Sequence, residues 1–417
     1  MAVPRVLLLV QGNPGSSGIG NIFLRQVVRH YPDRRLLRFS LVPHNAHQGD
    51  GIWCGIPAIT RRTLTSIFPI ASSLLYWRFR LLYVERLAEE IRHLVTSNQV
   101  DLIWSVLNSS FIIALTDQLM QTLEIPFVST VWDAPEYFAM NRHLDPVTTR
   151  ILLESYPRVL RRSHRLSVSC ESMRNVFLEK YGVDSLPWIH GVHHSLWQDR
   201  LPRILPPDRL VIGFAGSLYA KKEWNTLLAA LRSANGVIGG HRVTIKFIGR
   251  FPRTFAQMEP FVERTGRHSQ AETLEMLSDV DFGYLPYWFD PKRSYIVKTS
   301  FPNKLSTYLA AGIPVFYHGP TDSSPALFFK DYPVGLCCHS LETADILTTL
   351  SRLVTDTALR NSIAEARQAA LENALGLEVM LRQFATLLGI DRSELLPMGA
   401  DGSRKPSSQM CRCNGDE

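Results

Sequence analysis

Short β-rich runs alternate with helical stretches along most of this chain, and they do so in two series. The ten runs cover residues 5–10, 36–42, 101–107, 126–132, 164–170, 209–216, 242–249, 281–287, 313–319 and 334–338. Strands separated by helices favour a parallel sheet with helices on both faces. The order therefore predicts an α/β protein with doubly wound sheets.

The 417-residue length is too great for one ordinary domain. Between the two series, the stretch 185–209 is rich in Pro, Gly, His and Trp, as connectors are. The expected parts are an N-terminal domain, a connector, a C-terminal domain, a helix that packs back towards the N-terminal domain, and a disordered tail. Their bounds are 1–190, 191–208, 209–375, 376–395 and 396–417. Two such domains facing each other would form a cleft at the carboxyl ends of their strands.

Charge and composition exclude several classes of protein. The formal net charge of +7 comes mainly from scattered arginines, which fits an anionic ligand or a membrane surface rather than nucleic acid. Six cysteines without metal or disulfide spacing indicate a reducing cytoplasm. The first apolar run is too short for a signal peptide, and no stretch reaches the ~18 apolar residues of a spanning helix. We therefore expect a soluble or peripheral cytoplasmic protein.

The loop "GNPGSSGIG", residues 12–20, follows the first predicted strand. It lacks the G-x-G-x-x-G spacing and the downstream carboxylate of a dinucleotide site, and it lacks the Lys and Ser/Thr of a phosphate loop. What remains is a loop without side chains before a helix from Asn21, whose free N–H groups can face an anion. A glycine-rich turn without a ligand is the alternative.

The stretch "SFPNKLSTYLAAGIPV", residues 300–315, predicts a short helix that begins at Pro302 and stops at Gly312. Leu305, Tyr308 and Leu309 share its apolar face. The opposite sector holds Asn303, Lys304, Thr307 and Ala311. The free N–H groups, the helix dipole and an ammonium group at this helix start suit a pyrophosphate.

These residues resemble the donor-site signature of the two-domain GT-B glycosyltransferases, especially family 4, whose members read close to F-P-S-K-L-x-E-Y-x-A-A-G-x-P-V. Further segments resemble the family in the same order over residues 5–390. They are "VSTVWDAPEYF", "WIHGVHHSLW", "VIGFAGSLYAKKEWNTLLAAL", "IKFIGRF" and "LSDVDFGYLPY". The resemblance implies the GT-B fold, two facing Rossmann-like domains with a cleft between them.

The resemblance also implies roles for individual residues. Lys222 and Lys304 would bind the donor diphosphate, and Asp133 would stand beside the acceptor; these three are the expected catalytic residues. Donor-binding positions would be Gly18, Gly20, Gly216, Ser217, Leu285, Pro286, Asn303 and Thr307. Among these, Gly18 and Gly20 would admit the donor sugar, and Leu285 and Pro286 would lie near the base.

Three positions depart from the family pattern. Thr307 and Thr299 stand where many members have glutamates, and His193 stands where the connector usually has Asp. A threonine hydroxyl contacts ribose more weakly than a carboxylate does, and losing such a contact costs about 1.5–3 kcal/mol. Donor affinity, donor choice and retention of stereochemistry therefore stay open.

The expected activity is that of a metal-independent, retaining, hexosyltransferase-type enzyme of surface polysaccharide or glycoconjugate synthesis. Its donor is a nucleoside-diphosphate sugar, with no other cofactor, and its acceptor is a glycan or a lipid-linked molecule. Lysines and helix N-termini would stabilise the departing diphosphate. One alternative is a non-catalytic or regulatory GT-B protein that has lost donor chemistry. A phosphorylase or epimerase on the same scaffold is another, which the signature disfavours.

Three further features have competing interpretations. Residues 61–93 mix arginines with aromatic residues, which fits peripheral contact with an anionic membrane or equally a core helix with its connector. Asp279 and Asp281 form a D-V-D metal signature, but they precede a predicted core strand. The histidines are spaced too loosely for a zinc site, although one of them could be the general base of an inverting enzyme. They are His44, His47, His190, His193 and His194.

Overall fold

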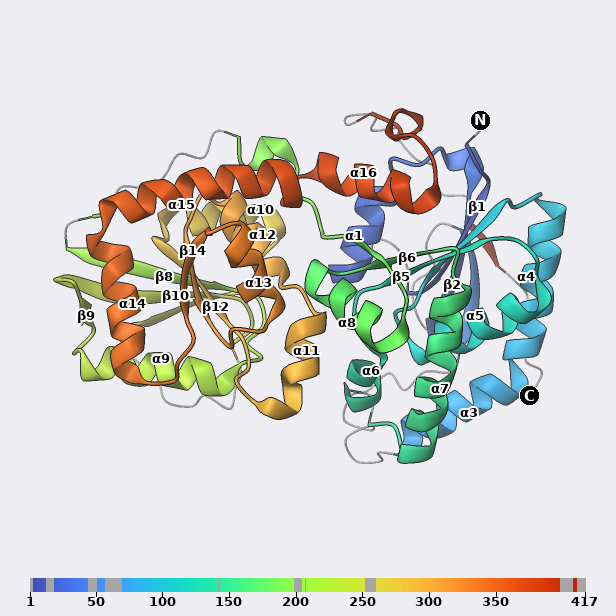
Figure 1. The fold of residues 1–417 in the computed structure, drawn as a ribbon, viewed down its shortest axis with the longest axis horizontal. Coiled ribbons are helices and arrows are strands. Elements are labelled where there is room, and N and C mark those ends of the chain that lie inside the picture. The colour runs from blue at the N-terminus through green and yellow to red at the C-terminus, as the bar shows by residue number, and fades with distance from the viewer. Residues whose placement is uncertain are drawn as a thin grey trace. The chain divides into compact units, whose positions relative to one another are not determined.

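A computed structural model gives the fold of the chain (Figure 1). It describes residues 3–12, 19–43, 51–56, 70–141, 143–198, 205–206, 208–251, 260–397 and 408–410. The chain divides into two compact units. The N-terminal unit comprises Met1–Trp188 with Leu381–Glu417, and the C-terminal unit comprises Ile189–Met380.

The N-terminal unit is built on one sheet with the strand order β15-β3-β2-β1-β4-β5-β6-β7, in which every pairing is parallel. Its strands are β1 (Val6–Gln11), β2 (Leu36–Pro43), β3 (Gly51–Ile56), β4 (Leu102–Val106), β5 (Phe127–Val131), β6 (Arg165–Val168), β7 (Leu186–Pro187) and β15 (Ser408–Met410). A parallel sheet directs the carboxyl ends of its strands to one edge. Gln11, Asn108 and Trp132 lie at or just beyond that edge.

Helices connect these strands. They are α1 (Ile19–Val28), α3 (Ile70–Leu82), α4 (Val84–Ser97), α5 (Ser110–Thr122), α6 (Pro135–Asn141), α7 (Pro146–Arg162) and α8 (Glu171–Tyr181). The last helix, α16 (Leu377–Leu388), contributes Phe384 to the core of this unit. The Phe384 ring stacks on Trp188 at 5.4 Å and contacts Trp104 at 5.0 Å between centroids. This aromatic contact holds α16 on the N-terminal sheet.

The C-terminal unit has a second sheet, with the parallel order β11-β10-β8-β12-β13-β14 and a short antiparallel β9 beside β10. Its strands are β8 (Arg209–Ala215), β9 (Val237–Ile238), β10 (His241–Ile248), β11 (Val262–Gly266), β12 (Phe282–Pro286), β13 (Val315–His318) and β14 (Gly335–Cys338). Its helices are α9 (Lys221–Ser233), α10 (Gln270–Met276), α11 (Ser294–Thr299), α12 (Asn303–Ala310), α13 (Ser324–Asp331), α14 (Thr343–Thr355) and α15 (Thr357–Ala370).

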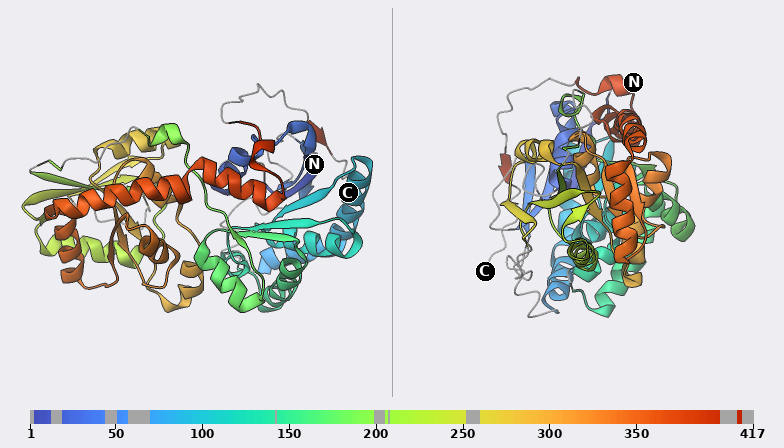
Figure 2. Two further views of the ribbon diagram at one scale, coloured as in Figure 1. Left: turned by 45° about the horizontal axis from the view of Figure 1, so that its top comes forward. Right: turned by 90° about the vertical axis from the view of Figure 1, so that its left-hand side faces the viewer.

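Alternate residues of β8 belong to two different core clusters, one on each face of this sheet. Val211 and Ala215 pack with residues of α12 and α13, whereas Ile212 and Phe214 pack with residues of α9 and α14. Because side chains alternate along a strand, helices on both faces produce this division. The arrangement is doubly wound, as predicted, and Figure 2 gives two further views of it.

Each of the ten predicted runs contains a strand. The sequence analysis missed β3, β7, β9 and β11. Of these, β11, "VERTG", is an edge strand whose side chains are largely exposed, so it shows no alternation of apolar and polar residues. Most of the expected disordered tail, 396–417, lies outside the described residues, but Ser408–Met410 pairs with β3. In the part of the chain that the structure describes, no helix is long and apolar enough to cross a membrane.

Candidate donor site and acid-base residues

A glycine loop lies at the carboxyl end of β8. Gly216 has a left-handed φ of 93°, and its N–H donates to the Ile248 carbonyl on β10 at 2.7 Å. A Cβ on Gly249, which follows β10, would lie 2.4 Å from the Gly216 oxygen. The two strand ends thus approach so closely that only glycine fits at residue 249.

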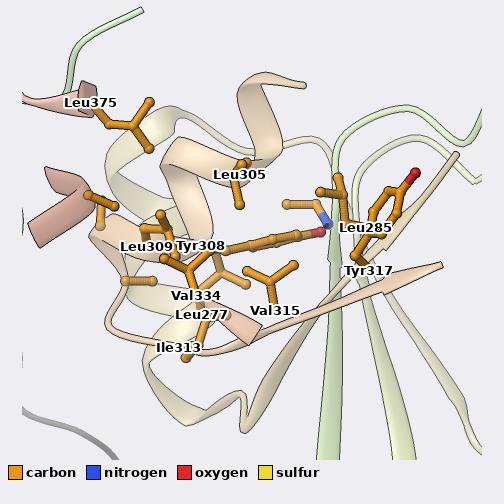
Figure 3. Close-up of a cluster of buried hydrophobic side chains, with 14 of the residues drawn as sticks. Leu277, Leu285, Leu305, Tyr308, Leu309, Ile313, Val315, Tyr317, Val334 and Leu375 are labelled. Atoms are coloured by element: carbon orange, nitrogen blue, oxygen red, sulfur yellow. Dashed lines mark hydrogen bonds between the residues drawn. The ribbon is translucent and has the colours of Figure 1, made fainter. Parts of the chain in front are cut away.

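The helix α12 is fixed beside this loop by Tyr308. The Tyr308 hydroxyl accepts from the Ala215 N–H at 3.0 Å and donates to the Tyr284 carbonyl at 3.1 Å. Its ring packs on Gly283, where a Cβ would lie 2.5 Å from the ring atoms. Figure 3 shows the ring reaching from α12 across to the strands. One buried side chain therefore fixes the position of α12 against the carboxyl end of β8.

Lys304 is held over the glycine loop. Its Nζ donates to the Ser217 carbonyl at 3.0 Å and lies 5.0 Å and 4.7 Å from the ring centroids of Phe214 and Tyr219. Burial lowers the pKa of Lys304 to about 7. Among the described residues no carboxylate lies within ion-pair distance of Lys304. A desolvated ammonium without an anion, directed at a glycine loop, is suited to bind an external anion.

The neighbouring residues present polar groups with few internal partners. Lys222 is exposed in the first turn of α9, Ser217 is exposed, and Asn303 is half-buried. Thr307 is half-buried and donates its hydroxyl to the Asn303 carbonyl at 3.2 Å. Thr299 is buried and donates to the Tyr295 carbonyl at 2.8 Å. Both threonine hydroxyl protons are thus used within their own helices.

Two details of α12 differ from the sequence prediction. Pro302 is the N-cap, so the helix begins one residue later, at Asn303. Ala311 was expected on the outward sector with Lys304, but it is buried, because the chain turns into β13 directly after it. That part of the prediction was wrong. Leu305, together with Tyr308 and Leu309, is buried as predicted.

Leu285 and Pro286 end β12 at the same edge of the sheet. The Leu285 side chain is fully buried in the cluster drawn in Figure 3. Pro286 is buried as well. A nucleobase would therefore contact Leu285 through its backbone, because the Leu285 side chain packs in the core.

Sequence reasoning missed the aromatic residues that shape this site. The Trp288 indole N–H donates to the Tyr219 carbonyl at 3.1 Å. The Phe289 N–H donates to Glu223 Oε1 at 2.9 Å, and Glu223 is 1% exposed. These bonds attach the segment after β12 to the start of α9. The sequence does show the aromatic run "YLPYWF", residues 284–289. Its partner Tyr219 lies at least 65 residues earlier in the chain, so the sequence did not indicate that they are in contact.

Asp133 lies two residues after the end of β5 in the N-terminal unit. Burial raises the pKa of this carboxyl to about 6. Glu136, three residues on, accepts from Lys180 Nζ at 2.6 Å and is committed to an ion pair. No ion pair of Asp133 occurs within the described residues. A carboxyl that titrates near neutral pH suits proton transfer.

Gly20 lies in the first turn of α1, which starts at Ile19 rather than at Asn21. A Cβ on Gly20 would lie 2.4 Å from the Trp132 ring. Packing of Trp132 against α1 is therefore a sufficient reason for this glycine. Gly18 lies outside the described residues.

The other metal and histidine candidates mostly have structural contacts. Asp279 pairs with Lys246 at 2.8 Å, and Asp281 accepts from the Val211 N–H at 2.7 Å. His193 caps a turn by accepting from the Ser195 N–H at 3.2 Å, a task that Asp performs at N-caps.

His194 packs its ring edge-on against Trp197, with 4.6 Å between centroids. Burial lowers the pKa of His190 to about 4. His44 and His47 lie outside the described residues. Within the described part of the chain no three His, Cys, Asp or Glu side chains are placed to hold a metal ion.

No protein-family model matches the chain, and no curated protein sequence matches it. Solved structures do. The chain is similar to sucrose-phosphate synthase from Thermosynechococcus elongatus, with 13% identity, a TM-score of 0.65, and coverage of 92% of this chain and 98% of that one. It is similar to Anabaena HepE in complex with UDP and glucose, at 14% identity, TM-score 0.61, and 93% and 99% coverage.

A third similar structure is the UDP-forming alpha,alpha-trehalose-phosphate synthase from Burkholderia vietnamiensis, at 14% identity, TM-score 0.61, and 92% and 99% coverage. At such identities the similarity establishes the fold, and the chemistry has to be argued from the residues of the site. The likeness covers nearly the whole chain and includes both doubly wound units. The chain has the GT-B fold.

Proposed function

We propose that this protein transfers a sugar from a nucleoside-diphosphate sugar to an acceptor. The observation that carries the proposal is Lys304, an ammonium without a carboxylate partner among the described residues, held on the Gly216–Ser217 backbone. Similar structures support a diphosphate ligand, because the Anabaena protein was solved with UDP and the Burkholderia enzyme is named as UDP-forming.

In this reaction the bond between the anomeric carbon and the β-phosphate oxygen breaks, and negative charge develops on the departing diphosphate. Lys304 would stabilise that charge, assisted by Lys222 and by the positive end of the α9 helix dipole. These groups supply the charge that a metal ion supplies in other transferases, so we propose a metal-independent reaction. Gly216 and Ser217 would approach the diphosphate through their backbone, and Asn303 and Thr307 would face the nucleoside.

The finer features of the proposal are a retaining, hexosyltransferase-type reaction and a glycan or lipid-linked acceptor in polysaccharide or glycoconjugate synthesis. We place the protein in the cytoplasm, in peripheral contact with a membrane. Asp133 would act beside the acceptor hydroxyl, because its raised pKa suits proton transfer near neutral pH.

A second candidate function is a GT-B protein that binds partners without donor chemistry. The observation in its favour is the pair Thr299 and Thr307, whose hydroxyl protons are used within their own helices. Release of nucleoside diphosphate separates the two functions. We expect the purified chain to release one nucleoside diphosphate from a panel of UDP, GDP, ADP and TDP sugars. Binding of a donor with no release over many hours would favour the second function.

Substitution of Asp133 by Asn tests the acid-base assignment. We expect kcat to fall about 10²–10⁴-fold, since a positioned acid or base contributes on that order. In the wild-type protein kcat should fall with acidity below a pH near 6, where the Asp133 carboxylate becomes protonated. The Asn variant should lack this limb and keep its affinity for the donor. An unchanged acid limb in the variant would remove Asp133 from the mechanism.

A further inference from the structure

The outward face of α3 is apolar where a solvent-facing helix is ordinarily polar. Ile70, Leu74 and Leu81 expose 62%, 63% and 73% of their surface. At 100° per residue, these three side chains project within about 40° of one another. They form a single stripe along the helix that the residues described by the structure leave uncovered.

The inward face of α3 already supplies the core contact that an amphipathic helix needs. Tyr76 and Phe79 are buried, and the Phe79 ring lies 4.7 Å from that of Phe111 on α5. The next helix, α4, shows the ordinary pattern, with the ion pairs Arg86–Glu90 and Arg92–Glu89 on its surface. The apolar stripe is therefore a property of α3 itself and is not explained by its core packing.

The stripe continues onto the start of α7. The Trp77 indole N–H donates to Thr148 Oγ1 at 3.0 Å, and the Asp145 N–H donates to Ser73 Oγ at 2.9 Å. Val147, next to Thr148, is 62% exposed. Figure 1 shows both elements at one margin of the N-terminal unit. We call the combined surface the docking face; it comprises Ile70, Leu74, Trp77, Arg78, Leu81 and Val147.

The charge around the docking face identifies its partner. Residues 70–82, which form α3, contain two arginines and no Asp or Glu. Of these, Arg78 is exposed, and Arg80 is half-buried and donates to the Tyr76 hydroxyl. An apolar stripe flanked by arginines complements an anionic bilayer, whose surface offers acyl chains and phosphates together.

We propose that the docking face lies on an anionic phospholipid surface, with the Leu and Ile side chains in the acyl boundary and Arg78 among the phosphates. This inference rests on the proposed function in one respect. The docking face is the surface at which the proposed lipid-linked acceptor would reach the N-terminal unit. With 13 residues, α3 would lie in the plane of the interface.

The test is flotation of the full chain with vesicles of phosphatidylcholine alone or mixed with phosphatidylglycerol. The wild-type protein should float with the anionic vesicles and be released by salt. Leu74→Ser combined with Leu81→Ser should weaken vesicle binding at least about tenfold, because each buried leucine contributes strongly to partition. A matched control is Leu178→Ser combined with Val237→Ser, which removes apolar groups exposed by 49% and 43% elsewhere. This control should bind as the wild type does.

All three proteins are also assayed for nucleoside-diphosphate release with a water-soluble acceptor, so that failure of vesicle binding and failure of the proposed function are seen separately. Vesicle binding lost only in the docking-face variant, with release unchanged, supports the proposal. Equal binding by both variants overturns it. So does a wild-type dimer that ignores vesicles and becomes a monomer on loss of Leu74 and Leu81, since the face would then be a self-interface.

Discussion

Replacing Lys304 with Ala is expected to lower kcat/KM for the donor about 10³-fold and to leave the protein at least as stable. The loss combines a charge-assisted contact to phosphate with charge stabilisation in the transition state. The variant should not lose stability, because the Lys304 ammonium is desolvated and has no carboxylate partner in the described structure. Steady-state kinetics and thermal melting measure the two effects.

The matched control is Lys330→Ala, which removes an exposed lysine at the end of α13. It should change neither kinetics nor melting. Lys304→Arg keeps the charge and should recover part of the donor affinity. A Lys304→Ala protein that melts much earlier than the wild type, with donor affinity intact, would show that Lys304 is structural.

Gly249→Ala is expected to destabilise the protein by about 1–3 kcal/mol and to weaken donor binding at least about tenfold. The new methyl group would lie 2.4 Å from the Gly216 oxygen, a backbone atom, so the glycine loop must move. Lys304 donates a hydrogen bond to the carbonyl of Ser217, the residue after Gly216. A shift of the loop should therefore also displace the Lys304 ammonium. Denaturant unfolding and donor titration measure the two effects.

Gly240→Ala isolates the steric effect. Gly240 also has a left-handed φ, of 85°, but a Cβ there would meet nothing within 4 Å. That variant should lose only about 1 kcal/mol through backbone strain and keep its donor affinity. Equal effects of the two substitutions on donor binding would contradict the close approach described here.

The sequence was sufficient to predict ten strands of the two sheets and the helix that carries Lys304, because each of these has a strong local pattern. Runs such as that of β8 are continuously apolar, as strands buried on both faces are. The buried face of α12, Leu305 to Leu309, follows from helical spacing. Edge strand β11 escaped prediction because an edge strand need not be apolar.

What the sequence could not predict are contacts between residues far apart in the chain. The rings around the Lys304 ammonium come from β8 and the loop after it, and Glu223 bonds to Phe289 across 66 residues. Gly20 illustrates the reverse case. Its glycine-rich context resembles a ligand loop, yet the Trp132 ring already explains why no side chain fits there.

The most direct test of the donor site is the number of protons taken up when UDP-glucose binds, measured by calorimetry at pH 8 in buffers of different ionisation enthalpy. Burial lowers the pKa of Lys304 to about 7, so at pH 8 this amine is mostly neutral in the free protein. A bound diphosphate should raise that pKa and draw in about one proton. UDP-glucose has no titrating phosphate of its own in this range, and Lys304→Arg should bind without uptake. Binding with no proton uptake by the wild type, or no binding of any UDP, GDP, ADP or TDP sugar, would contradict the account.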